Sequence, residues 1–134
     1  MRTPSPDTVI ATARGTSDVL GPLARIVLQY GGMIEERATA KGCKLEDWSA
    51  VAELVAVKNF KRVGAYMEVM NWQEYITFLT EWAGSTRFET TLFRISEVGR
   101  VVFQEIEERH YKGDDFIRKN VIAVYAFDDN DKIR

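Results

Sequence analysis

The chain is poor in the residues that build metal centres and disulfides. It has one cysteine and one histidine among 134 residues. A lone Cys43 excludes an intramolecular disulfide and a zinc site built on thiolates, and a lone His110 leaves few ligands for another metal. The neighbours of Cys43 include no base that would activate it as a nucleophile. We therefore predict no metal site and an inert thiol.

Long apolar runs and a strong charge of one sign are also missing. No apolar stretch approaches the ~18 residues of a membrane span, and the first residues lack the apolar region of a secretory signal. The formal net charge is −2, and the basic residues are scattered among acids, so no basic face for nucleic acid is indicated. No glycine-rich phosphate loop and no Ser-His-Asp arrangement is present. We expect no cofactor, no nucleic-acid or membrane partner, and a cytoplasmic setting.

The composition that remains is that of an ordinary globular protein. Hydrophobic residues make up 46% of the chain and charged residues 28%, and 134 residues suffice for one domain but not for two. We predict a single domain over residues 1–134. Residues 1–14 form its flexible or short helical lead-in, with Asp7 as a candidate N-cap for a helix that ends at Ala13.

The first half of the chain has three segments with helical spacing of apolar residues and one with the alternation of a strand. The predicted helices cover residues 22–42, 44–57 and 71–84, and the predicted strand covers residues 59–70. Gly31 and Gly32 should loosen the first helix, and Asn71 is a candidate N-cap of the third.

From Thr86 onward the chain alternates as strands do, with short turns between them. We expect strands over residues 86–96, 101–111 and 116–127, and a fourth that begins at residues 132–134. The turns are too short for crossover connections, so the sheet is an antiparallel meander. Helices followed by a meander predict an α+β fold with the helices packed on one face of the sheet.

The last long strand is apolar on both faces beyond Asn120. One face carries Ile122, Val124 and Ala126, and the other carries Val121, Ala123, Tyr125 and Phe127. A strand that is apolar on both faces is covered on both faces. Helices should cover one face, and a partner subunit or a cavity should lie against the other.

The strand before it changes from apolar to charged residues along its length. Ile106, Glu108 and His110 share one face because side chains repeat every two residues. If Ile106 points inward, the carboxylate and the imidazole do so too, and two titratable groups of different type on one face suit proton transfer. The alternative is a rim carboxylate paired with Arg109 or Arg118, beside an exposed histidine.

Four stretches follow one another in an order that is typical of a known superfamily. They read EDWSAVAELVA, NWQEYITFLTEWAG, VVFQEIEERHYKGDDF and NVIAVYAFDDNDKI, and they lie between Glu46 and Ile133. In this order they resemble the nuclear-transport-factor-2-like superfamily, in particular its SnoaL-like and limonene-epoxide-hydrolase-like branches. The resemblance implies a cystatin-like cone, in which a strongly curved antiparallel sheet packs on three helices and encloses a pocket. It also implies a short C-terminal strand here and homodimers formed across the outside of the sheet.

The resemblance carries over only part of a catalytic set. Glu108 is the best match to the acidic residue of the epoxide-hydrolase branch, and Ile106 stands where that branch has an arginine. The tyrosine and asparagine that hold water in that branch fall near Lys61 and Val63, which do not match, and its second acid would fall beyond Arg134. The isomerase branch has an aspartate base and a second acid at positions that are not acidic here.

These observations predict a cofactor-independent enzyme that binds an apolar organic substrate in the cone. Its acid/base chemistry would be epoxide hydrolysis, isomerisation, dehydration or cyclisation, with Glu108 and His110 as proton carriers. The predicted substrate-binding residues are Tyr30, Tyr66, Glu68, Ile106, Asn120 and Ile122. The two tyrosines would donate hydrogen bonds to a carbonyl or epoxide oxygen. The alternative is a non-catalytic module of this fold that binds a ligand or dimerises.

Overall fold

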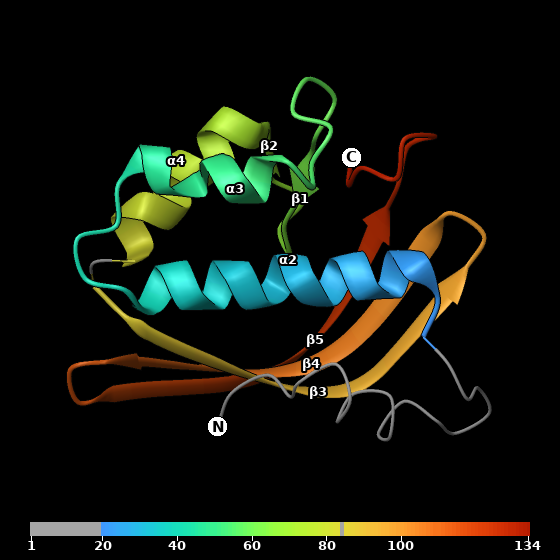
Figure 1. Ribbon diagram of the computed structural model, residues 1–134. Helices are drawn as coiled ribbons and strands as arrows, with labels where there is room; N and C mark the ends of the chain where they lie inside the picture. Colours follow the sequence, from blue (N-terminus) through green and yellow to red (C-terminus); the bar gives the residue numbers. More distant parts are fainter. Residues whose placement is uncertain (1–19, 84) are drawn as a thin grey trace.

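The computed structural model describes residues 20–83 and 85–134 (Figure 1). The helical elements are α2 (Pro22–Thr39), the 3-10 turn η1 (Leu45–Trp48), α3 (Ser49–Ala52) and α4 (Trp72–Ala83). The strands are β1 (Arg62–Val63), β2 (Val69–Met70), β3 (Arg87–Val98), β4 (Val101–Lys112) and β5 (Asp115–Ala126). Helices followed by an antiparallel meander confirm the predicted α+β class. The predicted helix over residues 7–13 lies outside the described residues.

The three long strands form one bent antiparallel sheet in the order β3-β4-β5. Tight turns join them at Gly99 and Gly113, whose φ angles of +59° and +60° favour glycine because it has no Cβ. The β3–β4 register shifts between Leu92 and Arg94, an irregularity that increases local twist and bending. The helices all lie on the concave side of the sheet, which rises at one end beside α2 (Figure 1).

Helix α2 lies along the sheet and supplies one side of the core. Its inward residues recur at helical spacing, as an amphipathic helix requires, and they include Leu23, Val27, Tyr30 and Ile34. The sheet supplies Leu92, Ile95, Val102 and Ile106. The predicted loosening at Gly31 and Gly32 is wrong, since α2 continues through both. Tertiary packing of the flanking residues outweighs the cost of roughly 1 kcal/mol for each glycine.

The predicted second helix over residues 44–57 is wrong in length, because η1 and α3 end at Ala52. Beyond them Val55 forms a parallel bridge with Ile133, and the Ala56 amide donates a 2.7 Å hydrogen bond to the Ile133 carbonyl. This pairing with the end of the chain occupies backbone groups that a longer helix would have used. It also replaces the predicted fourth strand, since Ile133 makes isolated bridges with Val55 and Phe127 only.

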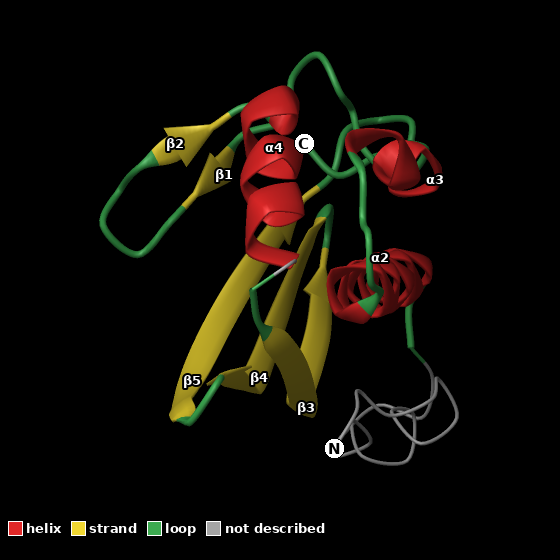
Figure 2. Cartoon of the chain, turned by 90° about the vertical axis from the view of Figure 1, so that its left-hand side faces the viewer, coloured by secondary structure: helices red, strands yellow, loops and turns green. Residues whose placement is uncertain are grey.

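The predicted single strand over residues 59–70 is a hairpin, formed by β1 and β2. The Gly64 amide donates to the Glu68 carbonyl at 2.9 Å, and Met67 has a φ of 65°. A Cβ at Gly64 would lie 1.6 Å from Oε1 of Glu68, so a larger residue would displace the Glu68 side chain. The hairpin projects beside α4, on the same side of the sheet (Figure 2). Local turn chemistry therefore divides a stretch whose alternation indicated one strand.

The third helix forms where the sequence predicts it. Oδ1 of Asn71 accepts a 2.8 Å hydrogen bond from the Glu74 amide, and Oε1 of Glu74 accepts one of 2.9 Å from the Asn71 amide. This reciprocal capping box satisfies two amide groups at the start of α4. It fixes the direction in which the helix crosses the concave face.

Candidate functional site

Strand β4 presents Glu108 and His110 to the concave side, which confirms the shared face expected from alternation. Nε2 of His110 lies 3.2 Å from Oε1 of Glu108. The imidazole also contacts two aromatic rings, with its centroid 5.8 Å from that of Trp82 on α4 and 5.0 Å from that of Phe88 on β3. Both side chains are about one-fifth exposed, at 22% and 20%, so a bound molecule can reach them.

Lys119 lies on the other side of the Glu108 carboxylate. It faces Glu108 across the β4–β5 register, and its Nζ is 3.8 Å from Oε1 of Glu108. Arg109, by contrast, bonds Glu107 at 2.7 Å, and Arg118 lies 3.9 Å from the same residue. The expected alternative, a rim pairing of Glu108 with Arg109 or Arg118, is therefore wrong. Glu108 sits between an imidazole and an ammonium group.

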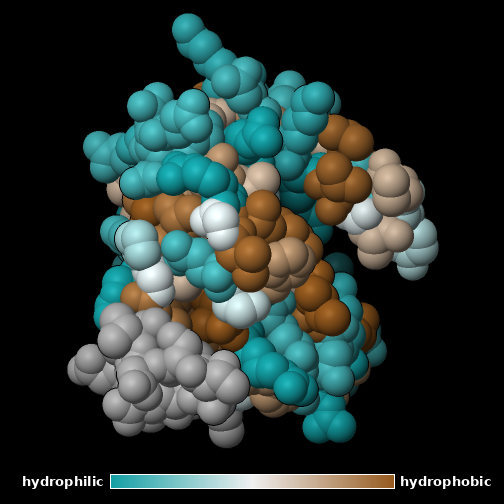
Figure 3. Space-filling view, turned by 90° about the vertical axis from the view of Figure 1, so that its right-hand side faces the viewer, coloured by the Kyte–Doolittle hydropathy of each residue, from teal (hydrophilic) through white to brown (hydrophobic). Residues whose placement is uncertain are grey.

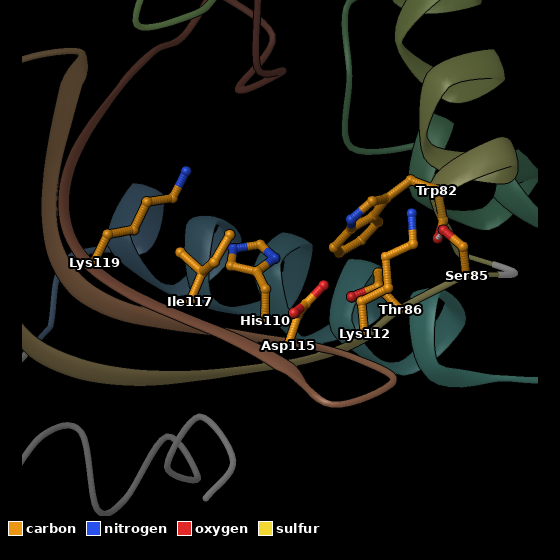
Figure 4. A pocket seen from close by; sticks show the side chains of 8 residues that line it. All are labelled: Trp82, Ser85, Thr86, His110, Lys112, Asp115, Ile117 and Lys119. Carbon is orange, nitrogen blue, oxygen red and sulfur yellow. Dashed lines mark hydrogen bonds between the residues drawn. The ribbon is translucent and has the colours of Figure 1, made fainter.

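A pocket of about 300 Å³ lies beside His110 (Figure 4). It is lined by Trp82, Ser85, Thr86, His110, Lys112, Asp115, Ile117 and Lys119. Trp82 comes from the end of α4, whereas the residues from His110 to Lys119 come from the β4–β5 hairpin (Figure 4). Trp82 and Ile117 supply its apolar side chains, and the other six lining residues are polar or charged. Sites for small organic molecules have volumes that begin at about 300 Å³.

A second group of polar side chains lies farther into the concavity. Tyr30 of α2 meets Tyr125 of β5 edge to face, with 5.9 Å between ring centroids. The Arg62 guanidinium lies over the Tyr75 ring, with its Cζ 5.4 Å from the ring centroid.

Burial keeps the three tyrosine hydroxyls protonated. It is the largest cause that raises the pKa of Tyr30, Tyr75 and Tyr125 above the ordinary value of 10.0. A protonated phenol both donates and accepts hydrogen bonds. These hydroxyls are therefore suited to binding an oxygen atom of a ligand, and not to acting as bases at neutral pH.

Arg62, Tyr75 and Tyr125 were not among the site residues predicted from the sequence. Tyr75 and Tyr125 lie on apolar faces of a helix and a strand, where they resemble packing residues. Each of these two tyrosines places a hydroxyl group on an otherwise apolar face. That hydroxyl was the feature of the sequence that could have identified them as site residues. Arg62 gave no such signal, since only the hairpin brings its guanidinium back onto α4.

Two predicted pocket residues, Asn120 and Ile122, lie on the wrong face. The register pairs Asn120 with Glu107 and Ile122 with Glu105, so both point to the convex side, where Ile122 is 71% exposed. The cause is the two-residue turn after Lys112, which pairs even-numbered residues of one strand with odd-numbered residues of the other. The two residues share a face, as expected, but it is not the face of Glu108.

Two further predicted pocket residues lie on the hairpin, outside the concavity. Tyr66 is 93% exposed at the hairpin turn. Oε2 of Glu68 accepts a 3.0 Å hydrogen bond from the Tyr66 amide, and its Oε1 lies 3.7 Å from Arg62. Placing Tyr66 and Glu68 inside the cone was therefore wrong. Ile106 and Tyr30 do face inward, and both are buried in the core.

The described residues offer neither a metal site of clustered side chains nor a helix that could span a membrane. Within residues 20–83 and 85–134, no group of three or more His, Cys, Asp or Glu side chains can hold a metal ion. No helix in the described ranges is long and apolar enough to cross a membrane.

Comparison with known proteins tests the predicted fold. No protein-family model matches the chain, and no curated protein matches it. Among solved structures, the chain is similar to an LEH-like epoxide hydrolase from M. tuberculosis, with a TM-score of 0.66 and 19% sequence identity. The match covers 83% of this chain and 76% of the other. This likeness shows the fold: the chain shares the α+β architecture of an LEH-like epoxide hydrolase, which confirms the predicted fold class.

Proposed function

We propose that this protein binds an apolar organic molecule in its concave pocket and catalyses acid/base chemistry on it without a cofactor. The observation that carries the proposal is the His110–Glu108 pair, with 3.2 Å between Nε2 and Oε1, in which His110 lines a pocket of about 300 Å³. The carboxylate orients the imidazole through its contact with Nε2. Nδ1 is then the atom that exchanges a proton with a bound molecule.

The same pair serves two reactions that begin with proton removal. In epoxide hydrolysis, His110 takes a proton from water as the water oxygen attacks a ring carbon. The C–O bond that breaks leaves its electrons on the epoxide oxygen, which then takes that proton back from His110 to give a diol. In isomerisation, His110 takes a proton from the carbon beside a carbonyl group and returns it to another carbon. The shared fold with an LEH-like epoxide hydrolase supports testing epoxides first.

The test is turnover of a panel of small epoxides and ketones by the wild-type protein and by matched variants. Glu108→Gln and His110→Gln should each lower kcat/KM by about 10²-fold or more, which is typical of a lost general acid or base. Glu105→Gln is the control, since Glu105 lies on the same strand but pairs with Arg94 on the convex face. Equal turnover by all four proteins, or no turnover of any compound by the wild type, contradicts the proposal.

A non-catalytic dimerisation module is the second candidate, and the convex face of the sheet favours it. Phe103, Ile122 and Val124 are 41%, 71% and 59% exposed there, and Phe103 lies opposite Val124 in the β4–β5 register. An exposed apolar patch of this kind is typical of a surface that a partner covers. We infer that a second copy of the chain covers it. Such a module would dimerise and turn over none of the compounds in the panel.

A further inference from the structure

The pocket beside His110 is lined mostly by polar side chains, although the proposed ligand is apolar. Six of the eight lining residues are polar or charged, and Lys112, Asp115 and Lys119 carry formal charges. At the opposite end of the molecule, apolar residues form the middle of the surface (Figure 3). A polar group that loses water to an apolar ligand and gains no new partner costs free energy. A ligand that suits this pocket therefore carries a polar group of its own.

The strand register arranges these charges in opposed pairs. Lys119 on β5 faces Glu108 on β4, and Asp115 faces Lys112. Nζ of Lys119 is 3.8 Å from Oε1 of Glu108, so the charge of Lys119 is already partly compensated. Figure 4 shows the Lys112 and Lys119 side chains at opposite ends of the pocket, with His110 between them. Each lysine therefore belongs to its own end of the pocket.

Lys112 supplies hydrogen-bond donors at its end of the pocket, beside Trp82 (Figure 4). Within the described part of the chain its ammonium group forms no ion pair or hydrogen bond, even though Asp115 lies opposite. The hydroxyls nearby have used their protons, since Ser85 and Thr86 each donate to a backbone carbonyl at 3.0 Å. An ammonium group has three N–H donors and no acceptor. The ligand group at this end is therefore an acceptor, and a negatively charged acceptor binds most strongly.

We propose that the pocket takes an apolar molecule that ends in a single carboxylate, and that the ammonium group of Lys112 binds this carboxylate. The inference rests on the proposed function, because it places the apolar body of the substrate against His110. His110 lies two positions before Lys112 on the same face of β4, about 7 Å along the strand. The reacting atom is then about that far from the carboxylate. The charge of Asp115 in the same pocket favours one negative charge on the ligand over the two of a phosphate.

The test is a binding measurement with two molecules of nearly the same shape, 2-naphthoate and 2-nitronaphthalene, which has a neutral nitro group in place of the carboxylate. Calorimetry on the wild-type chain at neutral pH should show about 10-fold tighter binding of 2-naphthoate, the effect of a hydrogen bond to a charged group. Lys112→Met should remove most of this preference and leave the affinity for 2-nitronaphthalene unchanged, whereas Lys112→Arg should retain the preference. Asp115→Asn should increase the preference by about 3-fold, because it removes a like charge.

Two further lysine variants serve as comparisons. Lys119→Met should lower the preference by less than Lys112→Met, because Glu108 already compensates Lys119. Lys61→Met, at an exposed position before β1, should leave the preference unchanged. Equal affinities of the wild type for the two molecules, binding of neither, or an undiminished preference in Lys112→Met overturns the inference.

The affinity for 2-nitronaphthalene shows whether each variant keeps a folded pocket, so a variant that fails to fold is recognised. The binding measurement is also independent of turnover. Turnover of neutral epoxides or ketones by a protein without the 2-naphthoate preference refutes the carboxylate site alone. The preference in a protein that turns over no compound of the panel refutes the catalysis alone.

Discussion

Nε2 of His110 lies 3.2 Å from Oε1 of Glu108, two positions away on the same strand. The pair needs no contact between distant segments, because alternate residues of a strand always share a face. The long-range contacts are those that surround it: Trp82 and Phe88 against the imidazole, and Lys119 against the carboxylate. Changes in those three residues should therefore alter binding and protonation while the pair itself remains.

Trp82→Ala should open the pocket wall. It removes an indole that lies 5.8 Å from the His110 ring and 5.2 Å from the Phe88 ring. We expect the binding of a ketone from the panel to weaken by about 10-fold and the free energy of unfolding to fall by about 2 kcal/mol, less than for a fully buried tryptophan. Calorimetry and urea denaturation measure both effects. Phe78→Ala, on the exposed side of the same helix, is the control. It should leave both the binding affinity and the free energy of unfolding close to their wild-type values.

Thr80→Val should destabilise the fold without touching the pocket. Nε1 of the fully buried Trp48 donates a 2.9 Å hydrogen bond to Oγ1 of Thr80, and valine has no acceptor. A buried donor left without a partner costs about 1–3 kcal/mol, and we expect a decrease of that size in the free energy of unfolding. Thr77→Val on the same helix is the control, because its hydroxyl is exposed and bonds only the Gln73 carbonyl. Equal effects of the two substitutions would contradict the assigned role of Thr80.

The buried tyrosines should make the protein less stable in alkali. The folded-state pKa values of Tyr30, Tyr75 and Tyr125 are raised above 10.0. Above that pH the unfolded chain releases protons that the folded chain retains, so stability falls as pH rises. Each tyrosine contributes a decrease of about 1.4 kcal/mol per pH unit between the unfolded and the folded pKa. Urea denaturation between about pH 9 and pH 11 measures the slope.

Substituting one buried and one exposed tyrosine distinguishes the effect of the buried hydroxyls from that of other groups that titrate in alkali. Tyr125→Phe should flatten the slope by about 1.4 kcal/mol per pH unit. Tyr66→Phe is the control and should leave the slope unchanged, because the Tyr66 side chain is 93% exposed. A slope that is the same in both variants and in the wild type would show that the buried hydroxyls do not cause it.

Val124→Lys should separate the proposed homodimer. It places a charge opposite Phe103 at the centre of the exposed patch on the convex face. Sedimentation should show that the dissociation constant of the dimer rises by about 10-fold or more, because burying an unpaired charge is costly. Val63→Lys, on the exposed hairpin, is the matched control. If the wild-type protein sediments as a monomer at high concentration, the proposed homodimer is contradicted.

The helix and strand boundaries show where local patterns are sufficient. The third helix and the three long strands lie within a few residues of the predicted ranges, since amphipathic periods and glycine turns are properties of neighbouring residues. The second helix and the strand over residues 59–70 were wrong. Each depends on a partner elsewhere: Ile133 pairs with Val55, and β2 folds back on β1.

The amino-acid sequence by itself determined the order of the elements and the shared face of Glu108 and His110, because backbone geometry sets both periods without reference to the rest of the chain. Only the tertiary structure decided that Asn120 and Ile122 face outward, because the turn after Lys112 fixes the strand register. It also brought the Arg62 guanidinium of the hairpin over the Tyr75 ring of α4, 5.4 Å from its centroid. No local pattern encodes that contact, because it depends on β2 folding back on β1.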